Sequence, residues 1–334
     1  MTATVETMRA VHVTAPGGPE VLKTVLLALP VPGPGQVRVR VAAIGVGTAD
    51  QLVRTGRYPW MPALPAVPGI EASGIVDAVG PGPNRYKVGD RVAISAEHNR
   101  NCYAEFVVQD AAWVFPVPDK VDLVEAGCLA TYRVAWHLLH TAARVRPGEW
   151  ALIIGAAGGV GAALLQLCRD AGVRTVAAVR GELKADFANR IGADLVVDTR
   201  RFSLAEAVRD ATGGGAAFVF DPVGGDQFTT HLGLLSAVGT LTLYGLIDGW
   251  PPENLLDPMR RRVAMSPAIR FFSLHSFDDK PAITAEVSER ILTRMANGAI
   301  RVPIHQRLRL DEASVAHRAL EEGKVVGKIV LVPE

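Results

Sequence analysis

The chain has 334 residues, of which 49% are hydrophobic and 21% are charged, so it is long enough to bury a sizeable core and to form two domains. Its 35 Lys and Arg residues balance 34 Asp and Glu residues with no long block of one sign, which argues against nucleic acid or an anionic membrane as a partner and favours small molecules. No apolar run reaches the roughly 20 residues that span a bilayer, the N-terminus has no signal-peptide pattern, and the three cysteines are scattered. We therefore expect a globular protein of the reducing cytoplasm.

The first part of the chain, up to about residue 118, predicts a mainly β domain. It is dense in Gly and Pro, and short Val-rich runs lie between these turn signals, as in strands joined by tight turns. The expected strands cover residues 10–13, 36–43, 74–79, 91–94 and 105–108.

From about residue 124, helical segments alternate with short apolar strands. The expected strands cover residues 151–154, 175–179, 195–197, 217–220 and 240–244. This alternation is typical of βαβ units and predicts a parallel sheet. A helix over 286–296 and a strand over 325–332 resume the earlier pattern, and we expect them to rejoin the first domain.

One of these strands leads into a glycine-rich turn. From Trp150 the chain runs Trp-Ala-Leu-Ile-Ile and then Gly-Ala-Ala-Gly-Gly-Val-Gly, and a helical pattern follows. Glycines let the backbone approach a pyrophosphate closely, and the N-terminus of the next helix offers free N–H groups. The fingerprint positions for glycine fall on Ala156, Gly158 and Gly161, with Gly159 and Val160 between the last two. Strand, turn and helix together predict a dinucleotide site; a loop that is only a turn is the alternative.

The end of the next strand indicates which nicotinamide cofactor binds. An acid about 20 residues past the motif would bond the ribose 2′-hydroxyl of NAD, whereas a cation suits the 2′-phosphate of NADP. The chain has Arg180 there, and Lys184 follows one turn into the next helix. We therefore predict NADPH. Glu182 keeps NAD as the alternative, with Arg180 and Lys184 then being solvated surface charges.

Five segments, in this order and spacing, resemble the medium-chain dehydrogenase/reductase superfamily, and above all its zinc-independent quinone oxidoreductase branch. They are Gly-Ile-Glu-Ala-Ser-Gly at 69–74, Val-Gly-Asp-Arg-Val at 88–92, the glycine-rich turn at 155–161, Asp-Pro-Val-Gly-Gly at 221–225 and Val-Gly-Lys-Ile-Val at 326–330. The resemblance extends over residues 8–333, nearly the whole chain.

The resemblance implies an α/β fold with two domains. One is a GroES-like, mainly β catalytic domain over residues 1–124 and 267–334, and the other is a Rossmann domain with a doubly wound parallel sheet, inserted over 125–266. A nucleotide cleft between the domains is implied as well. Relatives commonly form homodimers through the Rossmann sheet edge, which corresponds here to residues 240–249.

The resemblance also bears on metal binding, because zinc-dependent relatives place Cys, His and Cys at three motif positions. Those positions hold Gly47, Ile70 and Gly127 in this chain, and none of these residues can ligate zinc. Cys128 lies beside the third position without partner ligands, and three scattered cysteines cannot form the four-cysteine structural zinc lobe of alcohol dehydrogenases. We therefore expect a protein that works without a metal.

Three histidines are considered as further ligands. His137 and His140 stand three apart in an expected helix without a carboxylate or thiol partner, so we interpret them as ordinary helix histidines. His98 lies in a loop expected to border the cleft, and its default interpretation is a surface histidine.

The expected reaction follows from the missing metal. Zinc would stabilise charge on a carbonyl or alkoxide oxygen, whereas hydride addition to a quinone or an enone spreads that charge over a conjugated enolate. We therefore expect NADPH-dependent reduction of a quinone or an activated double bond. A metal-free carbonyl reductase or alcohol dehydrogenase, and an NADPH-binding protein with a sensing or other non-redox role, are the alternatives.

The resemblance suggests two residues for the catalytic site. Thr131 matches a threonine that lies beside the nicotinamide ring, and Tyr58 matches an aromatic position on the substrate side, either as a hydrogen-bond donor or as an apolar lid. Many quinone oxidoreductases read Asn-Pro-Val-Asp-x-Tyr where this chain has Gly-Thr-Ala-Asp-Gln-Leu at 47–52, so the asparagine and tyrosine are missing. Asp50 matches, and we interpret it as a helix cap or ion-pair partner.

The remaining expected cofactor contacts also come from matching positions. Thr199 or Arg200 follows the third Rossmann strand, where NADPH-binding relatives often have a tyrosine, and either could meet the 2′-phosphate. Backbone contacts to the nicotinamide are expected at Gly245, Phe271 and Phe272, and Lys328 matches a lysine near the cofactor. Lys328 as a solvated lysine between strand residues is the alternative.

Overall fold

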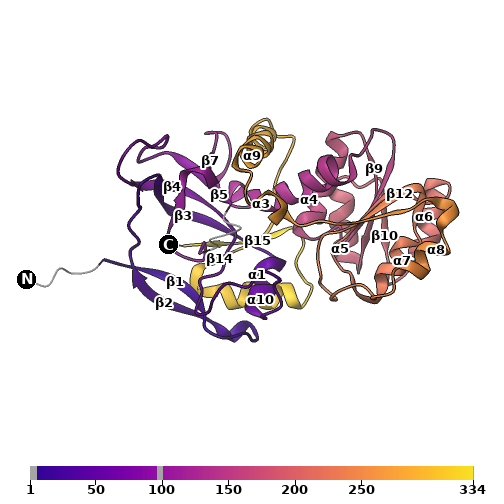
Figure 1. Cartoon of the computed structure of the whole chain (residues 1–334), viewed down its shortest axis with the longest axis horizontal. Coiled ribbons are helices and arrows are strands. Elements are labelled where there is room, and N and C mark those ends of the chain that lie inside the picture. The colour runs from indigo at the N-terminus through magenta and orange to yellow at the C-terminus, as the bar shows by residue number, and fades with distance from the viewer. Residues whose placement is uncertain (1–5, 96–100, 334) are drawn as a thin grey trace, which may run out of the picture. The chain divides into compact units, whose positions relative to one another are not determined.

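The computed structural model describes residues 6–95 and 101–333. They form two compact units (Figure 1): the first holds the described residues up to Arg133 and those from Phe277 onward, and the second is Val134–Ser276. Among the described residues, no helix has the length and apolar character needed to cross a membrane.

The first unit is built on a seven-stranded sheet with the order β14-β15-β3-β4-β5-β7, in which β6 pairs with β3. Its strands are β3 (Gln36–Val46), β4 (Glu71–Val79), β5 (Arg91–Ser95), β6 (Phe106–Asp110), β7 (Val114–Pro116), β14 (Ile304–Arg309) and β15 (Lys328–Val332). A separate antiparallel pair consists of β1 (Thr7–Val13) and β2 (Leu22–Ala28). The helices are α1 (Thr48–Arg54), α2 (Leu123–Ala126), α9 (Pro281–Ala296) and α10 (Ala313–Glu321), and α3 (Leu129–His137) leads into the second unit.

The core of the first unit follows from the alternation of side chains along its strands. Val37, Val39 and Val41 of β3 are buried while their neighbours are more exposed, so one face of the strand enters the core. Ile329 and Leu331 of β15, which pairs antiparallel with β3, lie in the same cluster. The long strand β3 therefore joins N-terminal and C-terminal segments of the chain in one sheet.

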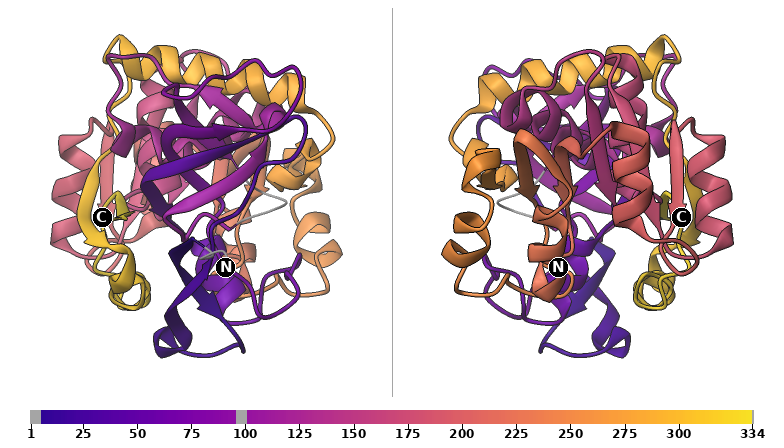
Figure 2. Two further views of the ribbon diagram at one scale, coloured as in Figure 1. Left: turned by 90° about the vertical axis from the view of Figure 1, so that its left-hand side faces the viewer. Right: turned by 90° about the vertical axis from the view of Figure 1, so that its right-hand side faces the viewer.

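The second unit is a six-stranded parallel sheet with the order β10-β9-β8-β11-β12-β13. Its strands are β8 (Trp150–Ile154), β9 (Arg174–Val179), β10 (Leu195–Asp198), β11 (Ala216–Asp221), β12 (Leu235–Leu243) and β13 (Ala268–Phe271). The helices α4 (Gly159–Asp170), α5 (Glu182–Arg190), α6 (Leu204–Thr212), α7 (Phe228–Leu232) and α8 (Leu256–Arg260) connect the strands, and helices lie against both faces of the sheet (Figure 2). A π-helical segment, Leu138–Ala143, follows α3, and 3₁₀ turns cover Pro19–Val21, Ala111–Trp113, Gly225–Gln227, Val263–Met265, Leu274–Phe277 and Leu310–Glu312.

The predicted α/β class is confirmed, and every strand expected from the sequence is present, although most have longer bounds. Three strands were not expected, β2, β7 and β14, whereas the resemblance implies a strand at residues 271–273, which meets the end of β13. β7 has only three residues, and the short edge strand β13 is largely exposed, so neither carries the long apolar run that marks a buried strand.

The two units divide the chain further along than the expected boundaries at 125 and 266. α2 lies against β3 and β4, so residues 123–126 belong to the first unit, which extends to Arg133. β13 pairs with β12, so residues 268–271 extend the parallel sheet of the second unit. The boundaries at 125 and 266, which the resemblance implies, stay a proposal.

Candidate functional site

The glycine-rich turn of the second unit has the geometry of a dinucleotide cradle. β8 ends at Ile154, the turn begins at Gly155 with a φ of 68°, and α4 begins at Gly159. The left-handed residue is therefore Gly155, while Ala156 is fully buried and needs no glycine conformation. This explains why alanine is tolerated at the first fingerprint position.

Gly161 is needed because α4 packs closely on the turn. A Cβ atom added there would lie 2.5 Å from the carbonyl oxygen of Gly155 and 2.7 Å from the Cα of Ala156. At Gly158, in contrast, the nearest atom would be 3.4 Å away, and this residue is exposed. Gly161 thus serves the packing of the helix, and Gly158 leaves the outer side of the turn open.

The N-terminus of α4 presents free donors. Its first backbone hydrogen bond runs from Ala162 N–H to the carbonyl oxygen of Gly158, at 2.8 Å. Within the described ranges, the N–H groups of Gly159, Val160 and Gly161 have no backbone acceptor. Because such groups and the helix dipole favour anions, this end of α4 suits a pyrophosphate.

Three cations gather beyond the carboxyl ends of β9 and β10. Burial, and then the charges of Arg180 and Arg200, lower the pKa of Lys184, which places the three side chains within electrostatic reach of one another. A Cβ at Gly181 would lie 3.4 Å from Nη1 of Arg200. As far as the structure describes the chain, none of the three cations forms an ion pair with a carboxylate. The cluster therefore has positive charge available for an anionic group.

Asp198, at the end of β10, organises the loop that carries these cations. Its Oδ1 accepts hydrogen bonds from the N–H groups of Gly181 at 2.8 Å and of Arg200 at 3.1 Å, which lower the pKa of the carboxyl group. The Thr199 hydroxyl donates to the carbonyl oxygen of Val179 at 3.2 Å. The hydroxyl proton of Thr199 is thus used within the loop, whereas the guanidinium of Arg200 is exposed beside the other cations.

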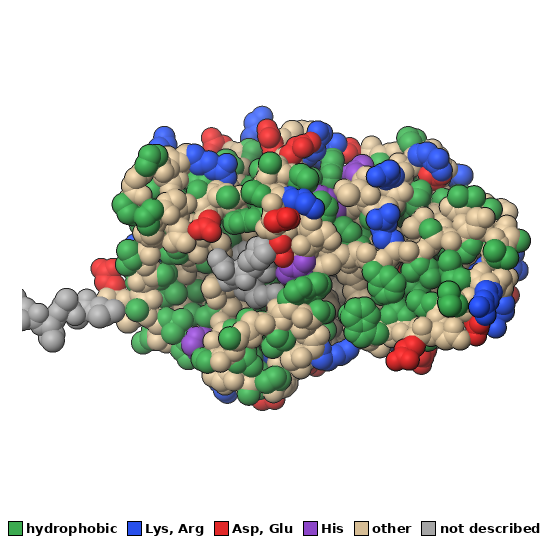
Figure 3. Space-filling view, in the orientation of Figure 1, with side chains coloured by type: hydrophobic (Ala, Val, Ile, Leu, Met, Phe, Trp, Pro, Cys, Tyr) green, Lys and Arg blue, Asp and Glu red, His purple; other side chains and the backbone are tan. Residues whose placement is uncertain are grey.

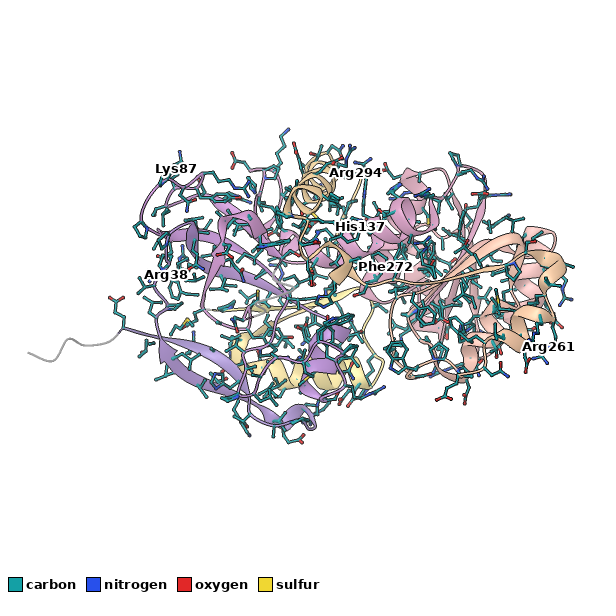
Figure 4. The ribbon with its side chains drawn as sticks, viewed as in Figure 1. Arg38, Lys87, His137, Arg261, Phe272 and Arg294 are labelled. Carbon is teal, nitrogen blue, oxygen red and sulfur yellow. The ribbon has the colours of Figure 1, made fainter. Side chains whose placement is uncertain are left out.

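The residues expected near the nicotinamide lie after β12 and at the end of β13. A Cβ at Gly245 would lie 2.5 Å from the carbonyl oxygen of Pro222, so glycine is required by close packing. The Phe272 N–H donates to the carbonyl oxygen of Leu243 at 2.8 Å, and Phe271 is 52% exposed. His137 and Phe272 lie close together in Figure 4, with ring centroids 6.4 Å apart. The Phe272 N–H is therefore already used in a backbone hydrogen bond.

A buried Asp–His pair at the end of β11 was not predicted. Asp221 accepts hydrogen bonds from Val223 N–H at 2.7 Å and Gly224 N–H at 3.2 Å through Oδ1, and its Oδ2 lies 2.8 Å from Nδ1 of His231. Asp221 is fully buried. The pair fixes the turn against which Gly245 packs, and the signal in the sequence was an acid directly after an apolar strand.

A second polar cluster lies within the first unit and contains Thr131 and Lys328. The Glu71 carboxylate accepts hydrogen bonds from the Thr131 N–H at 2.9 Å, the Thr131 hydroxyl at 2.8 Å and the Lys328 ammonium at 2.7 Å. Glu71 and Lys328 are 2% and 4% exposed. Glu71 was missed by the sequence interpretation, although an acid followed by the small and apolar run Ala-Ser-Gly-Ile-Val was a usable signal.

Lys328 keeps its charge in this buried position. Burial alone lowers the pKa of a lysine, but the charge of Glu71 and the hydrogen bond to it outweigh burial and raise the pKa of Lys328. The ammonium group also donates to the carbonyl oxygen of Val46 at 2.8 Å and to the Thr131 hydroxyl at 3.1 Å. Lys328 is thus a buried, fully bonded cation, not a solvated surface lysine.

The other sequence-predicted residues of the first unit lie around α1. Asp50 accepts a hydrogen bond from the Gly47 N–H at 2.9 Å and so caps this helix, as expected. Tyr58 lies in the loop after α1 with its ring centroid 5.7 Å from that of Trp60. His98 lies outside the described residues.

Two family descriptions match the chain: "Alcohol dehydrogenase GroES-like domain" over residues 33–141 and "Zinc-binding dehydrogenase" over residues 191–331. The quinone oxidoreductase of Salmonella typhimurium is 32% identical over 322 residues, which cover 95% of this chain and 97% of that protein. The chain belongs to the medium-chain dehydrogenase/reductase superfamily. Within it, the chain falls in the quinone oxidoreductase-like branch, and the predicted GroES-like and Rossmann folds are confirmed.

Solved structures of the superfamily agree with this assignment. Escherichia coli quinone oxidoreductase complexed with NADPH matches with a TM-score of 0.91 and 29% identity, covering 97% of this chain and all of that one. A mycobacterial protein, also complexed with NADPH, matches with a TM-score of 0.90 and 34% identity over 98% of this chain.

The zinc that gives one of these families its name does not fit the residues of this chain. A Cβ at Gly47 would lie 3.7 Å from the ammonium nitrogen of Lys328, so this ligand position faces a buried cation. Ile70 and Gly127 offer no thiolate, imidazole or carboxylate. Residues 6–95 and 101–333 contain no group of three His, Cys, Asp or Glu side chains that could hold a metal.

Proposed function

We propose that this oxidoreductase uses NADPH to transfer a hydride to a quinone or to an activated, enone-type double bond, without zinc. The observation that carries the proposal is the cluster of Arg180, Lys184 and Arg200 beyond the strand ends that follow the glycine-rich turn. A 2′-phosphate supplies the negative charge that these cations lack, and the pyrophosphate would occupy the free N–H groups of α4.

NADH fits this arrangement less well. Its free 2′-hydroxyl calls for an acidic acceptor at the end of β9, and that position is Arg180. Glu182, the first residue of α5, is exposed, and in the described part of the chain it pairs with none of the three cations. The two relatives with NADPH bound add support for the same cofactor.

The choice of acceptor follows from the chemistry of the residues at the metal positions. When bound, NADPH supplies the hydride. A quinone or enone then holds the resulting negative charge over a conjugated system, so hydrogen-bond donors can replace a Lewis acid. Thr131 is proposed beside the nicotinamide, and Tyr58 on the substrate side as a hydrogen-bond donor or an apolar lid.

The acceptor class is tested by following NADPH consumption spectrophotometrically with matched panels of quinones, enones, aldehydes and ketones. We expect turnover of quinones or enones only. Turnover confined to aldehydes and ketones would instead indicate a metal-free carbonyl reductase. Tight NADPH binding without oxidation by any compound would indicate a sensing or other non-redox role.

The expected dimer edge at residues 240–249 is not a free sheet edge, because β12 pairs with β13 there. We therefore propose that the protein forms a homodimer through β13, the edge strand of its parallel sheet. Hydrophobic side chains gather on the surface of the second unit in Figure 3. Ile247, Trp250 and Phe271 of this unit are exposed, with fractions of 46%, 67% and 52%. The Trp250 and Phe271 rings lie 6.4 Å apart, so they form one patch. The three cysteines are free and buried, which supports the proposed cytoplasmic location.

A further inference from the structure

The second unit contains a cavity that none of the residues proposed for NADPH lines. Its volume is about 500 Å³, within the roughly 300–1,000 Å³ of small-molecule sites. It is lined by two threonines of α7, two arginines that follow α8, and the apolar residues Pro258, Ala264 and Met265. The 3₁₀ turn Val263–Met265 comes shortly before β13, so this wall lies toward the amino ends of the parallel strands. Dinucleotides bind at the carboxyl ends, so the cavity is a separate place on the sheet.

Two arginines give the cavity a positive charge. Of the three consecutive arginines at 260–262, Arg260 pairs with Asp257, with Nη1 3.7 Å from Oδ1. Arg261 and Arg262 line the cavity, and throughout the described residues their guanidinium groups form no hydrogen bond or ion pair. Among the described residues that line the cavity there is no acid. Each guanidinium therefore keeps its N–H donors for a ligand.

The end of α8 lets both arginines reach the same cavity. Successive residues of a regular helix point about 100° apart, so a continuing helix would separate their side chains. α8 ends at Arg260, and Arg262 has a φ of −117° and a ψ of 11°, outside the helical region. Arg261 is exposed at the surface of the unit (Figure 4), whereas Arg262 is partly buried.

Gly233, at the C-terminal end of α7, fixes where the Arg262 guanidinium lies. A Cβ atom at Gly233 would lie 2.7 Å from Nη2 of Arg262 and 2.9 Å from the carbonyl oxygen of Thr230. The guanidinium thus occupies the space that the missing side chain leaves, against the last turn of α7. Its position is set before a ligand arrives, which lowers the entropic cost of binding.

The remaining walls supply a hydroxyl group and an apolar surface. The Thr230 side chain is exposed, and in the described part of the chain its hydroxyl has no hydrogen-bond partner. The Thr229 hydroxyl donates to the carbonyl oxygen of Asp226 at 3.4 Å, a long contact that is easily exchanged. Pro258 and Met265 offer carbon surface beside these polar groups. The cavity therefore combines anion-binding groups with a small apolar wall.

We infer that this cavity binds a small phosphate ester, with its phosphate group between Arg261 and Arg262 and its organic part against Pro258 and Met265. The guanidinium fork matches the oxygens of a phosphate, and two guanidinium groups match its two negative charges. The Thr230 hydroxyl donates to a further phosphate oxygen. This site goes beyond the proposed function and does not depend on it, because the 2′-phosphate of NADPH has its own cluster of cations.

The arginines are tested by isothermal titration calorimetry of the full chain with phenyl phosphate, in a phosphate-free buffer of constant ionic strength. We expect Arg261→Gln and Arg262→Gln each to weaken binding about tenfold, the contribution of one charged hydrogen bond. Arg260→Gln is the matched control and should keep native affinity, because Arg260 pairs with Asp257 and does not line the cavity. Equal losses in all three variants, or native affinity in the double variant Arg261→Gln with Arg262→Gln, would overturn the inference.

The chemical class of the ligand is tested with two further probes. Inorganic phosphate lacks the organic part and should bind about tenfold more weakly than phenyl phosphate, because it buries no apolar surface. Benzoate keeps the ring but has a single charge, and it should also bind about tenfold more weakly. Inorganic phosphate or benzoate binding as tightly as phenyl phosphate would overturn the assignment to a phosphate ester.

The role of Gly233 is tested without changing any charge. Gly233→Ala should displace the Arg262 guanidinium and weaken phenyl phosphate binding to the extent of Arg262→Gln, about tenfold. A melting temperature near that of the native protein shows that the variant is folded. Native affinity in folded Gly233→Ala would contradict the position assigned to Arg262.

Competition separates this cavity from the cofactor site. Saturating NADPH, and the variant Arg200→Ala, should both leave the affinity for phenyl phosphate unchanged. Displacement of phenyl phosphate by NADPH would place it in the cofactor site and overturn the inference. If the native protein binds no NADPH, the proposed function fails, whereas the variants of Arg261 and Arg262 still decide whether the cavity binds a phosphate ester.

Discussion

Removing Arg200 perturbs cofactor choice without disturbing the fold, because its side chain is exposed and only its backbone N–H is bonded to Asp198. A hydrogen bond to a charged group contributes about 1.5–3 kcal/mol, and the exposure of Arg200 places its contribution at the lower end. Since about 1.4 kcal/mol corresponds to a tenfold change in affinity, Arg200→Ala should raise the KM for NADPH about tenfold. The KM for NADH should not change.

Because Arg180, Lys184 and Arg200 lie close together, a variant that lacks two of them should raise the KM for NADPH by less than the product of the two single effects. Arg180 and Arg200 both lower the pKa of Lys184, after burial, so removing either arginine lets Lys184 hold its proton to higher pH. In the native protein Lys184 loses its charge as the pH rises through its lowered pKa, and the preference for NADPH should decline with it. Arg200→Ala should show this decline at a higher pH than the native protein.

The assay is the initial rate with each cofactor and a quinone acceptor, measured across neutral and alkaline pH at constant ionic strength. Arg190→Ala, at the exposed C-terminal end of α5, is the matched control and should keep native constants. An Arg200→Ala enzyme with an unchanged NADPH preference would refute the assignment of the three cations to the 2′-phosphate.

Three further predictions test the structure. Gly161→Ala should lower the free energy of unfolding by about 1–3 kcal/mol through overpacking. Gly158→Ala has room for its methyl group, so it should keep the native melting temperature and lose NADPH affinity. Equal melting temperatures of the two variants in thermal denaturation would contradict the packing at Gly161. Asp221→Asn should lower the free energy of unfolding by about 1–3 kcal/mol, because the new amide faces buried donors. Asp226 is exposed, so Asp226→Asn should leave the free energy of unfolding unchanged. Chemical denaturation measures both values. Phe271→Glu should give a monomer in light scattering and Val315→Glu should not, and a dimeric Phe271→Glu protein would argue against the β13 edge.

The sequence was sufficient for the local features of the cofactor site. The strand, turn and helix around Gly158 and Gly161 follow from apolar patterning and glycine spacing, which are properties of neighbouring residues. Arg180 directly follows β9 and Lys184 is the third residue of α5, only four positions later, so their proximity could also be expected. The left-handed conformation at Gly155 was not assigned, because the fingerprint alone does not give backbone angles.

Local sequence pattern could not predict contacts between residues that are far apart in the chain. Glu71 and Lys328 are 257 positions apart in sequence, and only the antiparallel pairing of β15 with β3 and of β3 with β4 brings them together. Each is the first residue of its strand and is followed by small or apolar residues, so its charge suggests a burial problem without naming its partner. The same holds for β13, whose place in the parallel sheet moved the boundary of the second unit.

The most direct test of the account is the ratio of kcat/KM for NADPH to that for NADH, with a quinone acceptor and protein treated with a chelator and analysed for zinc. We predict a ratio above about ten, since a single charged contact contributes about that factor, and full activity in protein without stoichiometric zinc. Equal kcat/KM values for the two cofactors, or a higher value for NADH, would contradict the proposed use of NADPH. Activity that returns only when zinc is added would contradict a reaction without zinc.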